Sequence, residues 1–123
     1  MAEDIKIEVS LLVLRCKDLN ATRSFYERLG LAFVEERHGK GPLHYAWENA
    51  GFVLELYSAT EQQFPDNVRL GFSTSLLADV SGRVLHDSSM KVLKSPYSTS
   101  NRLVMLLEDP DGRKVEVSQP LHS

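Results

Sequence analysis

The chain has 123 residues, of which 25% are charged, and its formal net charge is −3 at pH 7. This length supports one domain with a substantial core but not two independent domains. The slight negative charge, without a concentrated basic stretch, excludes nucleic acid as the main partner. No apolar run approaches the roughly 20 residues that span a bilayer, so the sequence predicts no membrane association and a cytoplasmic location.

The first half of the chain predicts one strand, one helix and three further strands. The apolar run IEVSLLVLRCK, residues 7–17, is typical of a strand. A helix follows, with Asn20 as its N-cap, Phe25 and Leu29 on one face, and Gly30 as its end. The segments LAFVEER, LHYAWEN and GFVLELYS predict three strands, and the last two form a hairpin that turns at residues 49–51. The single cysteine, Cys16, lies in the first apolar run and is expected to be a core residue.

The second half repeats this order after a polar stretch at residues 59–66, the one expected linker. NVRLGFSTS predicts a strand, and SLLADVSGRVLHD predicts a helix with Ser75 as its N-cap. MKVLKSPY, NRLVMLLED and RKVEVSQ predict three strands, with a tight turn at DPDG. Two copies of one unit of about 55–60 residues are therefore expected, each burying a face against the other.

Two glutamates in these strands are predicted to face away from the helices. Glu55 and Glu116 each lie between two apolar neighbours. Because successive residues of a strand point to opposite faces, apolar neighbours that pack on helices place both carboxylates on the other face.

Three segments carry a resemblance to a known family: LRCKDLNATRSFYERLGL at 14–31, VLEL at 53–56 and EDPDGRKVEV at 108–117. Together they resemble the vicinal oxygen chelate superfamily, which contains glyoxalase I, bleomycin resistance proteins and extradiol dioxygenases. The resemblance implies an α+β fold in which two βαβββ modules, about residues 7–58 and 67–119 of a single domain, form a curved mixed sheet around a cup. It also implies a homodimer and, in active members, a divalent ion held by one residue from each of four strands.

Two of these four positions depart from a metal-binding pattern. The last-strand positions match Glu55 and Glu116, but the first-strand positions are Leu11 and Arg69. Leucine has no donor atom for a metal, and arginine is a permanent cation with no acceptor. We therefore expect no metal and no cofactor, with Arg69 and Arg15 balancing the two glutamates in a polar cup that binds a small organic ligand.

The register of the hairpin leaves two alternatives for the rest of the cup. An even-sized loop around Asn49 and Ala50 places His44 opposite Glu55 on the concave face, where His44, Glu55 and Glu116 could hold one divalent metal ion. A three-residue loop places Tyr45 and Trp47 there instead, as an aromatic wall with Tyr57. The remaining histidines, His38, His86 and His122, are not expected to pair as ligands.

Three functions follow, of which the first is the expected one. It is a metal-free homodimer that sequesters a small molecule, supported by Leu11 and Arg69 and by a short P-D-N stretch similar to that of bleomycin resistance proteins. The second is a metal-dependent enzyme of the glyoxalase or dioxygenase type. The third is a metal-free enzyme in which Glu55 or Glu116 is the catalytic acid or base, although pairing with arginine lowers a carboxylate pKa and disfavours a base near neutrality.

Overall fold

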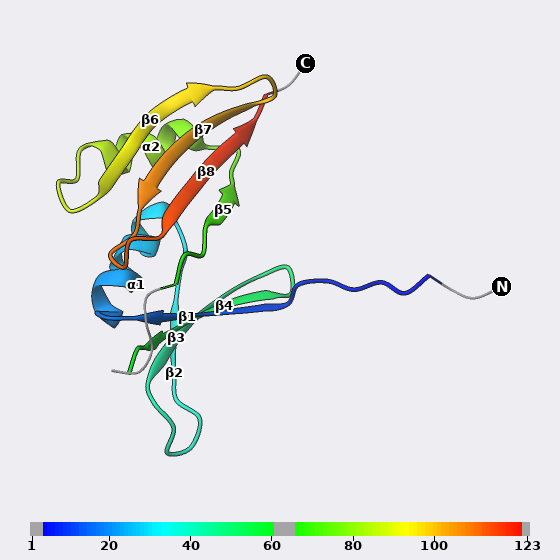
Figure 1. Ribbon diagram of the computed structural model, residues 1–123, viewed down its shortest axis with the longest axis vertical. Coiled ribbons are helices and arrows are strands. Elements are labelled where there is room, and N and C mark those ends of the chain that lie inside the picture. Colours follow the sequence, from blue (N-terminus) through cyan, green and yellow to red (C-terminus); the bar gives the residue numbers. More distant parts are fainter. Residues whose placement is uncertain (1–3, 61–65, 122–123) are drawn as a thin grey trace.

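The computed structural model describes residues 4–60 and 66–121, and it contains two modules with the same order of elements (Figure 1). The first consists of β1 (Leu11–Cys16), α1 (Leu19–Leu29), β2 (Val34–Glu36), β3 (His44–Asn49) and β4 (Phe52–Ser58). The second consists of β5 (Leu70–Ser73), α2 (Leu77–Leu85), β6 (Lys91–Ser98), β7 (Arg102–Glu108) and β8 (Lys114–Pro120). The predicted α+β class and the two βαβββ modules are confirmed.

Each module has its own four-stranded sheet, in the order β1-β4-β3-β2 or β5-β8-β7-β6. The first strand of each module pairs in parallel with the last, and the other pairs are antiparallel. In the described part of the chain β1 and β5 are edge strands of separate sheets, so the two modules form two curved sheets and not one continuous eight-stranded sheet. The helices contact each other between the sheets (Figure 1).

The core lies between the helices and one face of each sheet. Leu54, Leu56, Val115 and Val117 are all buried, together with Tyr26 of α1 and Val84 of α2. These four strand residues are the neighbours of Glu55 and Glu116, so the predicted alternation is confirmed: the apolar side chains face the helices and the glutamates face the other way.

Local signals at the helix ends were predicted correctly at one position and wrongly at two. Gly30 ends α1 in the left-handed conformation, with φ of 114°, as expected. The N-cap of α1 is Asp18 and not Asn20, because the Asp18 carboxylate accepts a hydrogen bond from the Ala21 amide at 3.0 Å. The helix α2 begins after Leu76 with no side-chain cap, so Ser75 does not have the predicted role.

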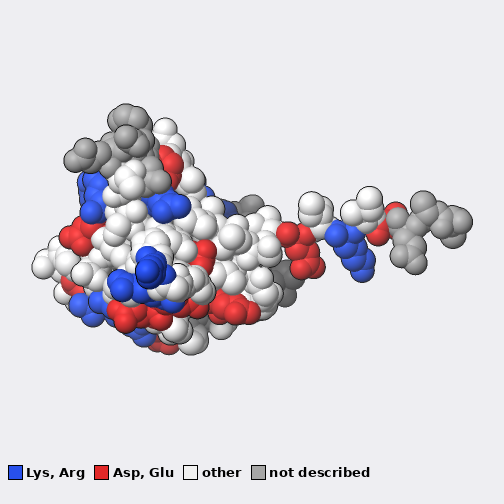
Figure 2. Space-filling view, turned by 90° about the horizontal axis from the view of Figure 1, so that it is seen from below, with Lys and Arg blue, Asp and Glu red and all other residues white. Residues whose placement is uncertain are grey.

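The first strand is shorter than predicted, because residues 4–10 pair with no other strand in the described part of the chain. Figure 1 and Figure 2 show this segment projecting from the body of the molecule. Ile5, Ile7 and Val9 alternate with polar residues along it and are exposed. On the face that Figure 2 presents, acidic and basic residues lie next to one another.

A network around Arg113 joins the two modules. The Arg113 guanidinium is 2% exposed and donates to Asp66 at 2.9 Å, to Asp109 at 3.2 Å, to Asp111 at 3.3 Å and to the Arg15 carbonyl oxygen at 2.7 Å. Burial acts to lower the pKa of Arg113, but hydrogen bonds to Asp66 and the charge of Asp109 outweigh it and raise that pKa. The DPDG turn therefore provides carboxylates for this junction as well as a tight reversal of the chain.

The predicted linker at 59–66 lies largely outside the described residues, and so does His122. Within the described ranges, no helix is both long and apolar enough to cross a membrane.

Candidate functional site

The exposed face of the first sheet contains a cleft beside Glu55. The cleft has a volume of about 450 Å³, and its walls are Val34, Ala46, Val53 and Ala32 with the carboxylates of Glu36, Glu48 and Glu55. An apolar floor with a few converging polar groups is the usual composition of a small-molecule site. This is the face on which the sequence predicted the cup.

The carboxylate of Glu55 lies beside an imidazole. The Nε2 atom of His44 is 3.5 Å from Glu55 Oε2 and 3.2 Å from Glu36 Oε1, and the His44 side chain is 1% exposed. Its other ring nitrogen, Nδ1, lies 3.2 Å from the Pro42 carbonyl oxygen. The ring of Tyr57 is stacked on that of His44 with centroids 4.3 Å apart, which fixes the plane of the imidazole.

The carboxylate of Glu116 lies instead between two guanidinium groups. Arg102 binds Glu116 Oε2 at 2.8 Å, and Arg69 binds Oε1 at 3.3 Å. The hydrogen bond from Arg102, with a further contribution from Arg69, holds the pKa of Glu116 below its ordinary value. Glu116 is therefore a half-buried ion-pair partner, and it is ionised at neutral pH.

Arg102 was not predicted as a site residue, although its position contains a usable signal. It lies on the same face of β7 as Leu106, the direct strand partner of Glu116. The direct strand partner of Arg102 is Pro120, four residues beyond Glu116, so Arg102 reaches Glu116 only because its long side chain extends back along the sheet. Arg15, which was predicted as the second counter-cation, lies over the ring of Tyr57 at 4.8 Å from its centroid.

The positions implied for a four-ligand metal site do not form one. Leu11 lies two residues before Val13, the strand partner of Glu55. Arg69 lies two residues before Gly71, the strand partner of Glu116, so Leu11 and Arg69 occupy equivalent places in the two modules. Leu11 is 52% exposed and has no donor atom, and Arg69 is a cation already bound to Glu116. The residues at these four positions do not fit a divalent ion.

The hairpin between β3 and β4 has a two-residue loop, in which Ala50 and Gly51 have φ of 51° and 86° and Asn49 pairs with Phe52. The loop is even-sized, so His44 lies on the face of Glu55 as in the first alternative, but the loop is one residue further along than expected, and Ala46 rather than His44 is the strand partner of Glu55. The three-ligand set of His44, Glu55 and Glu116 is not assembled, because the close partners of Glu116 are the two arginines.

Tyr45 and Trp47 consequently lie on the opposite face from Tyr57, so the aromatic wall of these three rings does not form. Tyr45 is buried in the core. Trp47 has its ring 6.2 Å from that of Phe72 and lines a separate cleft of about 430 Å³ between the modules, next to Gly71 and Val117.

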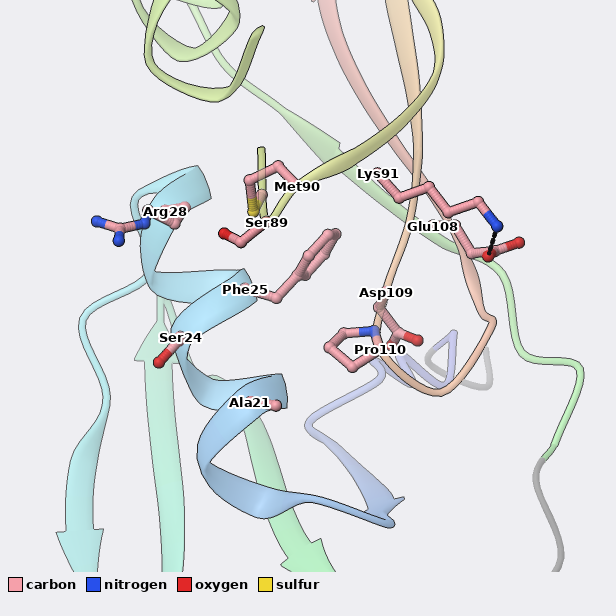
Figure 3. Close-up of a pocket in the computed structure, with 10 residues that line it drawn as sticks. All are labelled: Ala21, Ser24, Phe25, Arg28, Ser89, Met90, Lys91, Glu108, Asp109 and Pro110. Carbon is pink, nitrogen blue, oxygen red and sulfur yellow. Dashed lines mark ion pairs between the residues drawn. The ribbon is translucent and has the colours of Figure 1, made fainter. Parts of the chain in front are cut away.

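A third cleft, of about 460 Å³, lies where α1 meets the start of β6 and the end of β7 (Figure 3). Phe25 projects into it toward Met90, and Lys91 forms an ion pair of 2.7 Å with Glu108 at its edge. Arg28, on the other side, is paired with Asp87 at 2.9 Å. The charged groups at the edge of this cleft therefore already have ion-pair partners.

The structure also shows the surroundings of Cys16 and His38. Cys16 is fully buried, and desolvation raises the pKa of its thiol to about 11, so it is protonated at neutral pH and is not a nucleophile. His38 lies close to His44, with ring centroids 5.2 Å apart.

The fold and the site define a class of protein: a two-module α+β chain with a polar face on each curved sheet. A family model of the Glyoxalase/Bleomycin resistance protein/Dioxygenase superfamily matches residues 9–117. The chain belongs to this superfamily, as the resemblance indicated. No curated protein sequence matches the chain significantly.

Solved structures with the same fold include proteins with different functions. An antibiotic-binding protein from Streptomyces sp. CB03234 superposes with a TM-score of 0.76 at 23% identity, over 97% of this chain and 100% of that one. A glyoxalase/dioxygenase from Nostoc punctiforme has a TM-score of 0.76 at 18% identity, over 99% and 100% of the two chains. A virulence protein from Salmonella typhimurium has a TM-score of 0.73 at 22% identity, over 96% and 100%. At these identities the similarity establishes the fold alone.

Proposed function

We propose that this protein binds a small organic molecule with an anionic group in a polar cup, with no metal ion between Glu55 and Glu116. One observation carries the proposal: the Glu116 carboxylate is bound by the guanidinium groups of Arg69 and Arg102. These groups take the place of the metal ion that a metal-dependent relative would hold there. Each guanidinium has five N–H donors, and the ion pair uses only part of them. Arg69 is 57% exposed, so its remaining donors can bind a carboxylate or phosphate in bidentate fashion.

The fold occurs both in an antibiotic-binding protein and in a glyoxalase/dioxygenase with equal structural similarity, so the residues of the site have to decide between binding and catalysis. The pKa of Glu116 supports binding, because a carboxylate held ionised by two arginines is a weak base near neutrality.

We further propose that the cup is completed by a second copy of the chain. The edge strands β1 and β5 present backbone groups that another strand can pair with. The exposed segment before β1 alternates apolar and polar residues and could extend such a pairing. Sedimentation velocity at micromolar concentration should show a dimer, which the double variant Ile5→Asp and Ile7→Asp should weaken. A wild-type monomer would contradict this arrangement.

The binding proposal is tested by thermal shift against a panel of aromatic carboxylic acids, with excess chelator present. Arg69→Ala should abolish the stabilisation that a hit gives to the wild-type protein. Arg28→Ala is the matched control, because Arg28 is 56% exposed and also has one carboxylate partner but lines the cleft of Figure 3. If only the Arg28 variant loses binding, the ligand binds in the cleft of Figure 3 and not at Arg69. Stabilisation that disappears with chelator would contradict metal-free binding.

A second candidate, a metal-dependent enzyme of the glyoxalase or dioxygenase type, is favoured by the contact between Glu55 and His44. It predicts turnover of thiol adducts of 2-oxoaldehydes or of aromatic diols that is lost in Glu55→Gln and retained in Glu116→Gln. No turnover with added Zn²⁺, Ni²⁺, Mn²⁺ or Fe²⁺ would exclude it.

A further inference from the structure

The hairpin between β2 and β3 brings together three potential metal ligands. Glu36 is the last residue of β2 and lies directly opposite His44, the first residue of β3. His38 follows Glu36 by two residues, at the start of the connecting loop. One donor atom from each of Glu36, His38 and His44 lies within 4.8 Å of the other two. Within the described ranges, this is the set of histidine and acidic residues that converges closely enough for one ion.

The orientation of His44 is that of a metal ligand. A carbonyl oxygen accepts hydrogen bonds and cannot donate them, so the contact of Nδ1 with the Pro42 oxygen at 3.2 Å places a proton on Nδ1. The other nitrogen, Nε2, is aimed at the carboxylates of Glu36 and Glu55. A histidine that binds a metal commonly donates its second ring N–H to a backbone carbonyl, which fixes its tautomer. The stacked Tyr57 ring holds the same orientation from the side.

Three of the separations between donor atoms are near those of a tetrahedral site, and Glu55 lies beside His44 but outside the set of three residues whose donor atoms are all mutually close. Zinc bonds to histidine nitrogen and carboxylate oxygen are about 2.0–2.1 Å long, so ligand atoms of a tetrahedron lie about 3.3–3.4 Å apart. The separations here are 3.2 Å between Glu36 and His44, 3.5 Å between His44 and Glu55, and 3.8 Å between His38 and Glu36.

The negative charges of Glu36 and Glu55 beside His44 also favour a bound cation. Two carboxylates, Glu36 and Glu55, approach the same nitrogen of a buried imidazole. One proton on Nε2 would neutralise one of them, whereas a divalent ion would neutralise both. The cleft of about 450 Å³ reaches Glu36 and Glu55, so an ion held here would face a space large enough for a ligand.

The loop keeps His38 near the other two. The Gly41 amide donates to the His38 carbonyl oxygen at 2.9 Å. A Cβ atom at position 41 would lie 2.9 Å from that oxygen, closer than real Cβ contacts, so the turn depends on glycine.

We propose that Glu36, His38 and His44 form a zinc site on the first module, with Glu55 as a second carboxylate beside His44. This site lies on the second and third strands and their loop, and it shares only Glu55 with the positions that the superfamily resemblance implies. It is independent of the binding role proposed for Arg69 and Arg102.

The test is isothermal titration of Zn²⁺ into untagged, chelator-treated full-length protein, with Co²⁺ absorption as a second readout. The wild type should bind about one ion per chain, and Co²⁺ should give the intense visible bands of a tetrahedral site. His38→Ala and Glu36→Gln should each weaken Zn²⁺ binding at least tenfold. His38 is 76% exposed and Glu36 37% exposed, so neither change should prevent folding, which circular dichroism will check.

His86→Ala is the matched control, because His86 lies at the end of α2, outside this cluster. Its Zn²⁺ affinity should equal that of the wild type. Absence of Zn²⁺ binding by the wild type, or affinity unchanged in both the His38 and Glu36 variants, would overturn the proposal. Loss of Zn²⁺ binding in Glu116→Gln would also overturn it and would contradict the metal-free cup. Arg69→Ala should leave Zn²⁺ affinity unchanged, so the two proposals fail separately.

Discussion

Glu55 and Glu116 occupy equivalent positions in the two modules, on strands β4 and β8, yet they have different partners. Glu55 lies beside His44, which is an imidazole, and Glu116 lies between the guanidinium groups of Arg69 and Arg102. A guanidinium cannot lose its proton in proteins, so Glu116 has cationic partners at every pH at which it is ionised. An imidazole can be neutral, and its nitrogen can then bind a metal ion. The repeated fold therefore places one of these carboxylates between two permanent cations and the other beside a histidine.

The largest effect is expected from removing the junction that holds the two modules together. Arg113→Met leaves the buried carboxylate of Asp109 without its cation, and removing one partner of a buried pair costs about 3–5 kcal/mol. Urea denaturation at pH 7 should show a loss of this size in the free energy of unfolding. Arg83→Met, at an exposed arginine, should change it by less than about 0.5 kcal/mol. Equal losses in the two variants would show that the junction does not stabilise the fold.

An intermediate effect is expected from His44, and it tests the difference between the modules directly. With chelator present, His44→Leu leaves two carboxylates beside an apolar side chain, which should cost about 1–3 kcal/mol. Arg102→Leu should cost less than about 1 kcal/mol, because Arg102 is 40% exposed and Arg69 still pairs with Glu116.

The unfolding free energies of both variants are measured by the same denaturation experiment. In a background with Glu36→Gln and Glu55→Gln, the cost of His44→Leu should fall, since the two charges are gone. A larger cost for Arg102→Leu than for His44→Leu would reverse the comparison.

The smallest effect is the pH dependence of Glu116. Its pKa in the folded protein is lower than its ordinary value of 4.5, so its ion pairs stabilise the fold above that pH. The contribution is lost as the pH falls below 4.5 through the lower, folded-state pKa. Glu116→Gln should therefore be less stable than the wild type by about 1 kcal/mol at pH 7, and the difference should shrink in acid.

Glu35→Gln, at an exposed glutamate of β2, is the matched control for the pH series. A gap between wild type and Glu116→Gln that widens as the pH falls would contradict the assigned direction of the shift.

Much of the fold was predictable because it depends on local patterns. The alternation around Glu55 and Glu116 determined which face each carboxylate occupies, and the repeated order of elements indicated two modules. The N-caps were missed because Asp18, Asn20 and Ser75 are all acceptable capping residues in sequence, and only the backbone path selects among them.

The sequence alone therefore determined the family, the two modules and the facing of the glutamates, since these depend on periodicity and on motifs along one segment. The tertiary structure decided the partners of each carboxylate. The two-residue loop at Ala50 and Gly51 set the register that brings His44 to Glu55, and the curl of the preceding hairpin brought His38 beside them. Arg102 reaches Glu116 diagonally across two paired strands. Such contacts depend on strand register and side-chain reach across the sheet, which the order of residues along a single strand does not specify.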